Sequence, residues 1–510
     1  MKKTLVKAIF TITFFAVLTR AASFGFKIFL SRELGATTLG VYQVGLSVFF
    51  VLLALTSSGI PLVASKLTAK HRVANNLKAE HGVFSGALII NLVCAAAICF
   101  FVLVFRNQIS GRFAAYESFI VLLLLLPCIA TSAVTMAVRG NLWGRQLFRD
   151  VCLIDFAETA LRIIVCVLMF VAFDNSLYSA AASLSVAYFI SAVVSAVVYI
   201  KRKGRLGDPR KHIGPLVKSG APITMVRAST TITASITAFV IPLIITWQGR
   251  SAAEALAFFG ATMGMALPIL YIPNTVIGAL AFVLVPELAS STERGEAGQN
   301  RLKMQVEQAI IFSVIISAVF IPALLIMGRP AAMFLFNNEL AGQFLSAAAL
   351  LLIPIGIESI TSSIMNSLGL EVQGFVNYIL GAALMFAFMF IMRARFDGYL
   401  LVVSLAIMLT FSSVLDVWAI KRKTGAGLKF LPPLCISLAI LVPASFFTYF
   451  LYNIIALPVF LRLALTGILS SAFTAGLMII FGVIKISALF SEKKKTRTKT
   501  QTSRAKSQLQ

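Results

Sequence analysis

The 510-residue sequence contains few of the residues on which catalysis and metal binding depend. It has three His, six Cys and only 12% charged residues. His71, His81 and His212 are accompanied by no His/Asp/Glu cluster, phosphate-binding loop, nucleophile elbow or metal-ligand spacing. The six Cys fall in apolar segments, where thiols behave as small buried hydrophobic groups. We therefore expect no enzyme activity, no catalytic residue, no metal and no cofactor.

Acidic residues are also scarce, with 19 Asp and Glu against 44 Lys and Arg. Hydrophobic residues make up 59% of the chain and form continuous runs long enough to cross a bilayer. Because these runs do not alternate with a period of two, they favour helices over a barrel. The sequence thus predicts an all-α polytopic membrane protein. Fourteen spans are expected, at residues 8–30, 39–64, 83–105, 117–138, 151–173, 177–200, 221–246, 258–286, 308–327, 343–366, 374–392, 398–420, 431–452 and 457–482.

The positive charges alternate along the chain in a way that orients the expected spans. With the N-terminus inside, 32 of the 44 Lys and Arg fall in inner segments and seven in outer loops. This bias predicts a multi-pass protein of the cell (cytoplasmic) membrane with both termini in the cytoplasm. It also accounts for the net charge of +25 without a nucleic-acid partner. The five remaining cations lie within spans, at Arg20, Lys27, Arg162, Arg227 and Arg462.

A weak internal repeat appears at an offset of 225 residues and predicts two parallel six-helix lobes around a central cavity. The paired motifs are Pro61-x-x-Ala64-Ser65 with Pro286-x-x-Ala289-Ser290, and Asn141-x-x-Gly144 with Asn366-x-x-Gly369. The expected domains are an N-terminal lobe at 1–200, a basic cytoplasmic linker at 201–213, a C-terminal lobe at 214–423, two additional transmembrane helices at 424–484 and a disordered basic cytoplasmic tail at 485–510.

The first expected span carries two cations where lipid would make them costly. Arg20 and Lys27 are one heptad apart and therefore share one stripe of a helix with Thr13. A cation at mid-membrane costs at least ~3 kcal/mol unless it faces water or an anion. A structural ion pair or a snorkelling side chain is the alternative, but Arg20 is about 18 Å from Ala8 by helical rise. We interpret the stripe as part of a cavity for something anionic.

Other spans carry charges whose roles the sequence leaves open. In the fifth, Glu158 precedes Arg162 by four residues, the favourable order for an ion pair, and Asp155 shares their face. Structural pairing and a functional site explain this pattern equally well. Glu358 is a candidate proton or cation site, or a partner for an arginine, and Asp416 is placed to pair with Lys421.

The seventh and eighth spans supply the remaining candidates. Arg227, Thr230 and Thr237 lie on one stripe of span seven, for which we favour a cavity-facing role, although hydroxyls in membranes also bond back to their own helix. Pro268 and Pro273 in span eight suit a helix that bends for gating, and ordinary kinking is the simpler alternative.

Several stretches of residues 5–420 resemble the stage V sporulation protein B-like transporters. They are Leu34-Gly35-Ala36, Leu39-Gly40-Val41-Tyr42-Gln43, Ser58-Gly59-Ile60-Pro61, Arg139-Gly140, Gly144-Arg145-Gln146 with Glu158, Phe259-Gly260, Gly264-Met265-Ala266, Pro268, Pro273 and Leu284-Val285-Pro286. This group belongs to the polysaccharide-flippase branch of the MATE-like (MOP) superfamily, which also contains the lipid II flippase. Arg20 is in a position that matches a cavity arginine of that branch, Arg227 is a looser match, and Trp143 departs from the family pattern.

The resemblance implies two lobes that alternate between inward- and outward-open states. It also implies a flippase for a polyprenyl-diphosphate-linked glycan, such as a peptidoglycan precursor or a polysaccharide repeat unit. Membrane lipids and envelope glycan-synthesis proteins are the expected partners. Arg20, Lys27, Arg227 and Arg162 are the expected substrate-binding residues. Two alternatives remain: a MATE-like exporter of organic cations, which would favour acidic groups in its cavity, and a non-transporting scaffold of envelope assembly, which would need no buried arginines.

Overall fold

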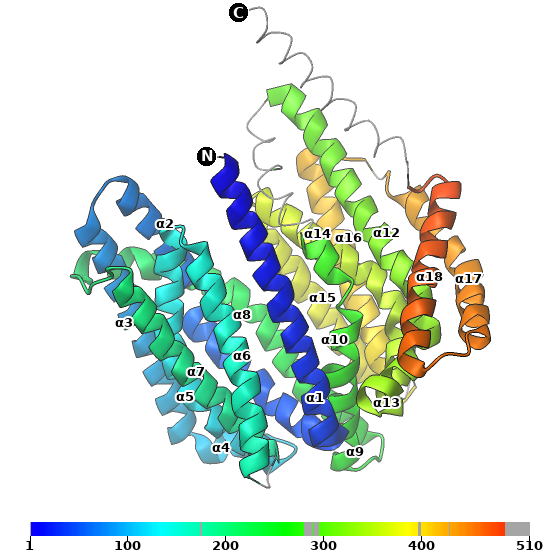
Figure 1. Ribbon diagram of the computed structural model, residues 1–510, viewed down its shortest axis with the longest axis horizontal. Helices are drawn as coiled ribbons and strands as arrows, with labels where there is room; N and C mark the ends of the chain where they lie inside the picture. Colours follow the sequence, from blue (N-terminus) through cyan, green and yellow to red (C-terminus); the bar gives the residue numbers. More distant parts are fainter. Residues whose placement is uncertain are drawn as a thin grey trace, which may run out of the picture. The chain divides into compact units, whose positions relative to one another are not determined.

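The computed structural model describes residues 2–173, 176–279, 288, 295–395, 399–427 and 429–484. Within these ranges every regular element is a helix, which confirms the predicted all-α class (Figure 1). The predicted tail at 485–510 and the second copy of the proline motif at 286–290 lie outside the described residues, apart from Leu288. By contacts the chain divides into an N-terminal unit, Met1–Pro268 with Phe336–Ala341, and a C-terminal unit, the described parts of Ile269–Leu335 and Gly342–Gln510.

The first element of the N-terminal unit, α1, joins two helices through one glycine. It runs over Lys2–Ser57 and contains Gly35 at φ 68° and ψ 173°, a conformation that only glycine adopts without strain. The first expected span and most of the second therefore form one kinked element. A second break at Ser58–Gly59 separates α1 from α2, Ile60–Val73, which has a proline in its first turn.

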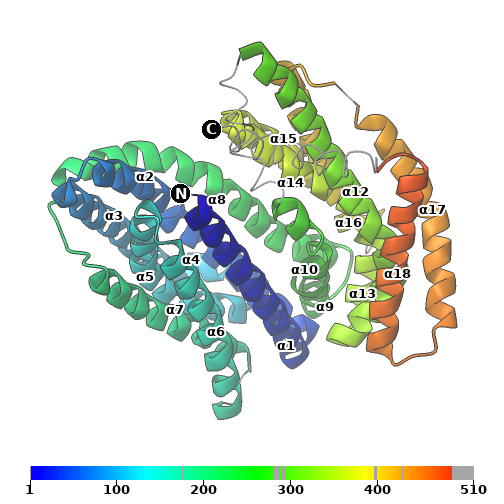
Figure 2. The ribbon, with the colours of Figure 1, turned by 45° about the horizontal axis from the view of Figure 1, so that its top comes forward.

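Seven more helices and a π-helical segment complete the N-terminal unit. They are α3 (Leu77–Val104), α4 (Arg106–Ser110), α5 (Tyr116–Gly144), α6 (Phe148–Ala172), α7 (Ser176–Lys201), α8 (Arg210–Trp247), α9 (Ala252–Phe259) and η1 (Gly260–Ala266). Helix α5 is central, because it contacts α1, α2, α3 and α7. The first half of α1 lies beside α6 (Figure 2). Val83, Val138 and Leu216 join α3, α5 and α8 in one buried apolar core.

The C-terminal unit contains a second set of packed helices. They are α12 (Gly295–Phe336), α13 (Glu339–Ala347), a short 3₁₀ turn (Ala348–Leu351), α14 (Leu352–Ser367), α15 (Glu371–Ile391), α16 (Leu400–Thr424), α17 (Leu431–Ile454) and α18 (Val459–Ile480). Ile310, Ile360 and Ile420 form a buried core between α12, α14 and α16. Helices α17 and α18 form an antiparallel hairpin (Figure 1), in which the rings of Phe447 and Phe473 stack at 4.0 Å and Thr448 bonds Ser470.

The division by contacts does not fall in the basic linker expected at 201–213. Helices α8 and α9 and the π-helix η1 contact α1, and the N-terminal unit therefore continues to Pro268. Two glycines permit this contact, since a Cβ on Gly40 would overlap the carbonyl oxygen of Leu256 and one on Gly260 would overlap that of Ala36. The backbones of α1 and η1 thus touch directly, as small residues allow in membrane helix pairs.

Twelve helical segments among the described residues are long and apolar enough to cross a membrane. One of them, Val17–Val73, covers two of the expected spans. Helix α6 coincides with another expected span but is not among the twelve, because it carries Asp155, Glu158 and Arg162. The multi-span architecture is confirmed, and the total of fourteen stays a prediction.

Candidate functional site

The cations of α1 and α6 form a positively charged surface on the N-terminal unit. Arg20 and Lys27 are exposed, and neither has an ion pair with a residue that the structure describes. On α6, the Arg162 guanidinium carbon lies 5.1 Å from the centroid of the Phe26 ring, an arrangement that favours a cation. Arg162 is also close enough for its charge to act on Lys27. We call Arg20, Lys27 and Arg162 the cationic face; its charge is not neutralised by any carboxylate among the described residues.

Of the two alternatives for α6, structural pairing applies to Glu158, but its partner is not Arg162. Glu158 instead pairs with Arg139 of α5, whose Nη2 lies 2.9 Å from Glu158 Oε2 and 2.6 Å from Asp155 Oδ1. The hydroxyl of Ser191 on α7 donates a second hydrogen bond to Glu158, at 3.1 Å. We call these four residues the α5–α7 cluster. In this cluster one arginine serves two carboxylates, and Arg162 is left with an aromatic ring in place of a carboxylate.

The polar stripe predicted on α8 is only partly exposed. Arg227 is exposed and donates through Nη1 to the carbonyl oxygen of Ser58 at 3.4 Å, at the break between α1 and α2. A cation at this place also complements the negative end of the helix that finishes at Ser57. Thr230 is exposed, whereas Thr237 is buried, and both hydroxyls bond back to their own helix. Thr237 therefore does not share the exposed side of α8 with Arg227.

The two prolines proposed for gating lie where the eighth expected span is irregular. Pro268 is the second residue of α10, Leu267–Leu270, which directly follows the π-helix. Pro273 ends a turn at residues 271–273, after which the helix resumes at Asn274. The division between the two units also falls at Pro268. A segment that changes from α to π to turn within fifteen residues has fewer regular backbone bonds than a continuous span.

The C-terminal unit holds one buried and one half-buried carboxylate, Asp416 and Glu358, without a basic partner among the described residues. Asp416 of α16 is 1% exposed, and its two oxygens accept from Asn377 of α15 at 2.7 Å and Thr361 of α14 at 3.3 Å. Lys421 therefore does not pair with Asp416 as expected. Glu358 accepts from Ser413 of α16 at 3.4 Å. We call these five residues the α14–α16 cluster.

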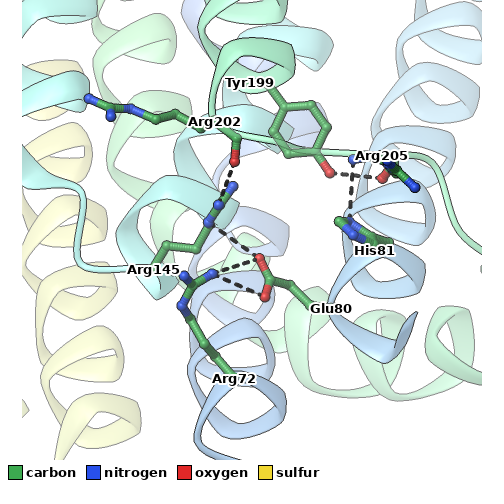
Figure 3. A network of polar contacts seen from close by, with 7 residues as sticks. All are labelled: Arg72, Glu80, His81, Arg145, Tyr199, Arg202 and Arg205. Atoms are coloured by element: carbon green, nitrogen blue, oxygen red, sulfur yellow. Dashed lines mark hydrogen bonds and ion pairs between the residues drawn. The ribbon is translucent and has the colours of Figure 1, made fainter. Parts of the chain in front are cut away.

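A third polar network ties together the end of the N-terminal unit at which α2, α5 and α7 finish (Figure 3). Glu80, 1% exposed on α3, pairs with Arg72 of α2 at 3.3 Å and with Arg145, just after α5, at 3.4 Å. Arg145 donates in turn to the carbonyl oxygen of Arg202 at 2.6 Å. Arg202 holds Asp150 at the start of α6 through two bonds of 2.6 and 2.7 Å, and this carboxylate raises the pKa of Arg202.

The same network binds the segment between α7 and α8. The hydroxyl of Tyr199 donates to the carbonyl oxygen of Arg205 at 3.0 Å, and the amide of Arg205 donates to His81 at 3.3 Å. The amide of Gly207 bonds Ser85 of α3 at 2.9 Å. These contacts explain why α8 stays with the N-terminal unit, because the connection to it is bonded along its length. His71 and His212 also meet here, with ring centroids 5.3 Å apart, and both are half-buried.

Sequence reasoning missed Arg139, Glu80 and Asn377. In the sequence, Arg139 is one of many inner-loop cations at the end of a span. The one signal for its partner was that Glu158 follows 19 residues later, on the other side of the α5–α6 turn. Glu80 stands among basic residues at the start of a span, which is a usable signal for an ion-pair hub. Asn377 carried no signal, because a single amide in an apolar run has no characteristic spacing.

This architecture defines a class: a polytopic membrane protein with the helical fold of multidrug and lipid transporters. It superposes on the lipid II flippase MurJ in an inward closed conformation with a TM-score of 0.72, covering 92% of this chain and 98% of that one at 13% identity. An inward-facing MATE family multidrug transporter of the MOP superfamily gives a TM-score of 0.68, with 80% and 94% of the two chains covered at 15% identity. At these identities the likeness establishes the fold.

The sequence comparisons identify the family. Residues 5–291 match the family described as polysaccharide biosynthesis protein, and the chain belongs to this family. Stage V sporulation protein B of Bacillus subtilis (strain 168) is 20% identical over 416 residues, which cover 77% of this chain and 79% of the relative. The resemblance predicted from the motifs is therefore confirmed at the level of the family and of the fold.

Proposed function

We propose that this protein is a flippase that moves a polyprenyl-diphosphate-linked glycan across the cytoplasmic membrane by alternating access, with both termini in the cytoplasm. The observation that carries the proposal is the cationic face. Three membrane-helix cations, Arg20, Lys27 and Arg162, lack a carboxylate partner among the described residues, while the nearby acids are occupied by Arg139. Membership of the polysaccharide biosynthesis family and the fold shared with a lipid II flippase support the same reading.

The physical requirement for such a site is the desolvation of a diphosphate. A charged headgroup cannot enter hydrocarbon without replacing its lost hydration, which is otherwise very costly. Exposed guanidinium and ammonium groups supply charge-assisted hydrogen bonds to phosphate oxygens, and Arg can do so with two bonds at once. The prenyl chain is apolar and can remain in lipid. In this proposal Arg20 and Lys27 bind the diphosphate, Arg162 adds charge from α6, and Arg227 contributes from α8 beside Thr230.

The test is transport in proteoliposomes with a fluorescent polyprenyl-diphosphate sugar whose label is bleached from outside. Wild type should expose the label on both leaflets, and Arg20→Ala should reduce the initial rate at least tenfold while the protein elutes as a folded monodisperse species. Arg106→Ala, which removes an exposed cation of α4 away from the cationic face, is the matched control and should leave the rate unchanged. An Arg20→Ala rate equal to that of the control would refute the proposed site.

Coupling to an ion is the role we propose for the α14–α16 cluster. Asp416 of α16 accepts from Thr361 of α14, Glu358 of α14 accepts from Ser413 of α16, and no described basic residue pairs with either carboxylate. Oxygen ligands from carboxylate, amide and hydroxyl groups suit a proton or a small hard cation. Pro268 and Pro273 would let the eighth span bend as the two states interconvert.

An exporter of organic cations is the second candidate, and one observation favours it: the same α14–α16 cluster would also attract a cationic substrate. The two candidates differ in which cluster contacts the cargo. Ethidium efflux that needs Asp416 and is indifferent to Arg20 would establish the exporter, whereas lipid flipping that needs Arg20 would establish the flippase. A scaffold without transport activity would show neither dependence.

A further inference from the structure

The tripeptide Lys-Arg-Lys occurs twice, each time where a helix of one unit ends. Lys201-Arg202-Lys203 closes α7, and Lys421-Arg422-Lys423 closes α16. Both helices precede a segment that folds back on an earlier helix, since Gly207 bonds Ser85 on α3 and Gly427 bonds Glu307 on α12. The two arginines thus stand at corresponding helix ends, 220 residues apart, and their surroundings can be compared directly.

In the N-terminal unit the arginine is neutralised within the protein. Arg202 donates two short bonds to both carboxylate oxygens of Asp150, which lies in the first turn of α6 and is 8% exposed. This bidentate geometry uses the planar edge of the guanidinium that would otherwise bind an external anion. Arg202 therefore has little capacity left for a ligand.

In the C-terminal unit an acid stands at the corresponding helix start, but it does not pair with the arginine. Glu371 occupies the first turn of α15, as Asp150 does in α6, yet Arg422 has no ion pair with it or with any other described residue. Arg422 instead lies over the Trp418 ring, one helical turn earlier, with 4.1 Å between its guanidinium carbon and the ring centroid. Trp418 is 49% exposed, and Arg422 is exposed as well.

The stacking fixes the guanidinium while leaving its hydrogen-bonding edge open. The ring approaches the guanidinium carbon, and no described carboxylate pairs with the five N–H donors, which remain available to an external acceptor. Trp residues concentrate at the membrane–water interface, where the phosphates of lipid headgroups lie. The neighbouring Lys423 is already engaged with the carbonyl oxygen of Leu368, so Arg422 is the pre-oriented cation of the triplet.

We propose that Arg422, held on Trp418 at the end of α16, binds the phosphate of an anionic phospholipid, with a preference for phosphatidylglycerol-type lipids over zwitterionic ones. The charge bias of the sequence predicts the cytoplasmic leaflet for this end of the helix. The site is separate from the cationic face, and it does not depend on what the protein transports. Its occupant would be a structural or regulatory lipid.

Trp418 itself reports on this site. The chain has three Trp, and replacing the other two (Trp143→Phe, Trp247→Phe) leaves Trp418 as the only strong fluorophore. In liposomes of phosphatidylcholine, brominated phosphatidylglycerol should quench Trp418 with a relative binding constant about fivefold above that of brominated phosphatidylcholine, the factor expected for one cation near a membrane surface. This preference should fall in high salt.

Two variants separate a bound headgroup from general attraction by positive charge. Arg422→Ala should reduce the preference to about one, whereas Lys421→Ala, which removes an exposed cation from the same turn, should leave it close to the starting value. Arg422→Lys keeps the charge without the planar fork and should give an intermediate value. Equal quenching by both lipids, or the same preference in Arg422→Ala, would overturn the proposal.

Native mass spectrometry provides a second readout that does not need the Trp substitutions. The otherwise unaltered protein should retain phosphatidylglycerol over phosphatidylethanolamine after detergent activation, and Arg422→Ala should lose this selectivity while Lys421→Ala retains it. Identical adduct distributions for wild type and Arg422→Ala would contradict the assignment even if the fluorescence background failed to fold. Failure of Arg20-dependent transport would leave this result unaffected, because the two sites share no residue.

Discussion

The two units each carry a polar cluster between three membrane helices, but the clusters differ in charge balance. In the α5–α7 cluster, Arg139 is in contact with both Asp155 and Glu158. In the α14–α16 cluster, Asp416 and Glu358 have amide and hydroxyl donors in place of a cation. Asp416 follows Ser191 by 225 residues, which is the offset of the sequence repeat. The comparison teaches that places related by the repeat offset can have different polar surroundings: a cation contacts the carboxylates of one cluster, and only amide and hydroxyl donors contact those of the other.

The largest expected effect comes from removing the cation of the α5–α7 cluster. Arg139→Ala leaves two carboxylates without their cation and should reduce the free energy of unfolding by roughly 3 kcal/mol, a value at the low end for buried pairs because Asp155 is partly exposed. Denaturant unfolding in mixed micelles measures the change. Arg162→Ala is the control and should cost about 1 kcal/mol at most, because it removes only the contact with Phe26. Equal losses for the two variants would contradict the assignment of Glu158 to Arg139.

Neutralising Asp416 in the α14–α16 cluster should leave stability nearly unchanged but alter transport. Asp416→Asn preserves the shape and the contact with Thr361, so unfolding should change by about 1 kcal/mol or less. Transport in proteoliposomes should, however, stop responding to an imposed proton or sodium gradient. Glu158→Gln in the other unit is the matched neutralisation and should keep the gradient response. A gradient response that survives in Asp416→Asn would remove the coupling role.

Removing a hydrogen-bond donor from the α14–α16 cluster tests how much its carboxylate depends on uncharged donors. Asn377→Leu withdraws the 2.7 Å bond to Asp416 and should cost about 2 kcal/mol, because it leaves a buried carboxylate short of a donor. The stability lost through Asn377→Leu should be smaller when it is made in the Asp416→Asn background, because a neutral side chain at position 416 depends less on the donor. Unfolding of the two single variants and the double variant gives this coupling, and strict additivity would show that the contact contributes nothing.

The smallest effect is expected from the two serines. Ser191→Ala removes a 3.1 Å donor to Glu158 and should cost about 1 kcal/mol, and Ser413→Ala removes a 3.4 Å donor to Glu358 and should cost less. Thermal unfolding of both variants under one set of conditions tests the order. A larger loss for Ser413→Ala would show that Glu358 depends on that hydroxyl more than its geometry suggests.

The sequence predicted the helical class, the positions of most spans and the family, because each depends on local composition or on short motifs. Hydrophobic runs had to become helices in lipid, and glycine and proline motifs such as Gly59 to Pro61 mark a break that the structure contains. The exposure of Arg20, Lys27 and Arg227 also agrees with the polar stripes predicted for them.

The sequence did not predict the partners and the exposure of several side chains, because these depend on how each helix is rotated against its neighbours. The four-residue spacing of Glu158 and Arg162 indicated a pair within α6, but α5 presents Arg139 to the same carboxylate and displaces Arg162 toward Phe26. Thr237 shares a stripe with Arg227 by periodicity, yet it is 5% exposed and Arg227 is exposed. Asn141 is buried while its repeat partner Asn366 is exposed, so equivalent motifs do not guarantee equivalent surroundings.

The direct contact of α1 with the π-helix has a consequence for biosynthesis. Gly260, the first residue of the π-helix, meets the carbonyl of Ala36, which is more than 200 residues earlier in the chain. At ribosomal rates of about 5–20 residues per second, the first helices must wait at least ten seconds in the membrane before this surface can be covered. During that interval the glycine-lined side of α1 is open to lipid or to a membrane-insertion factor. The N-terminal unit can therefore finish packing only after the ribosome has made the π-helix, which lies just past the midpoint of the chain.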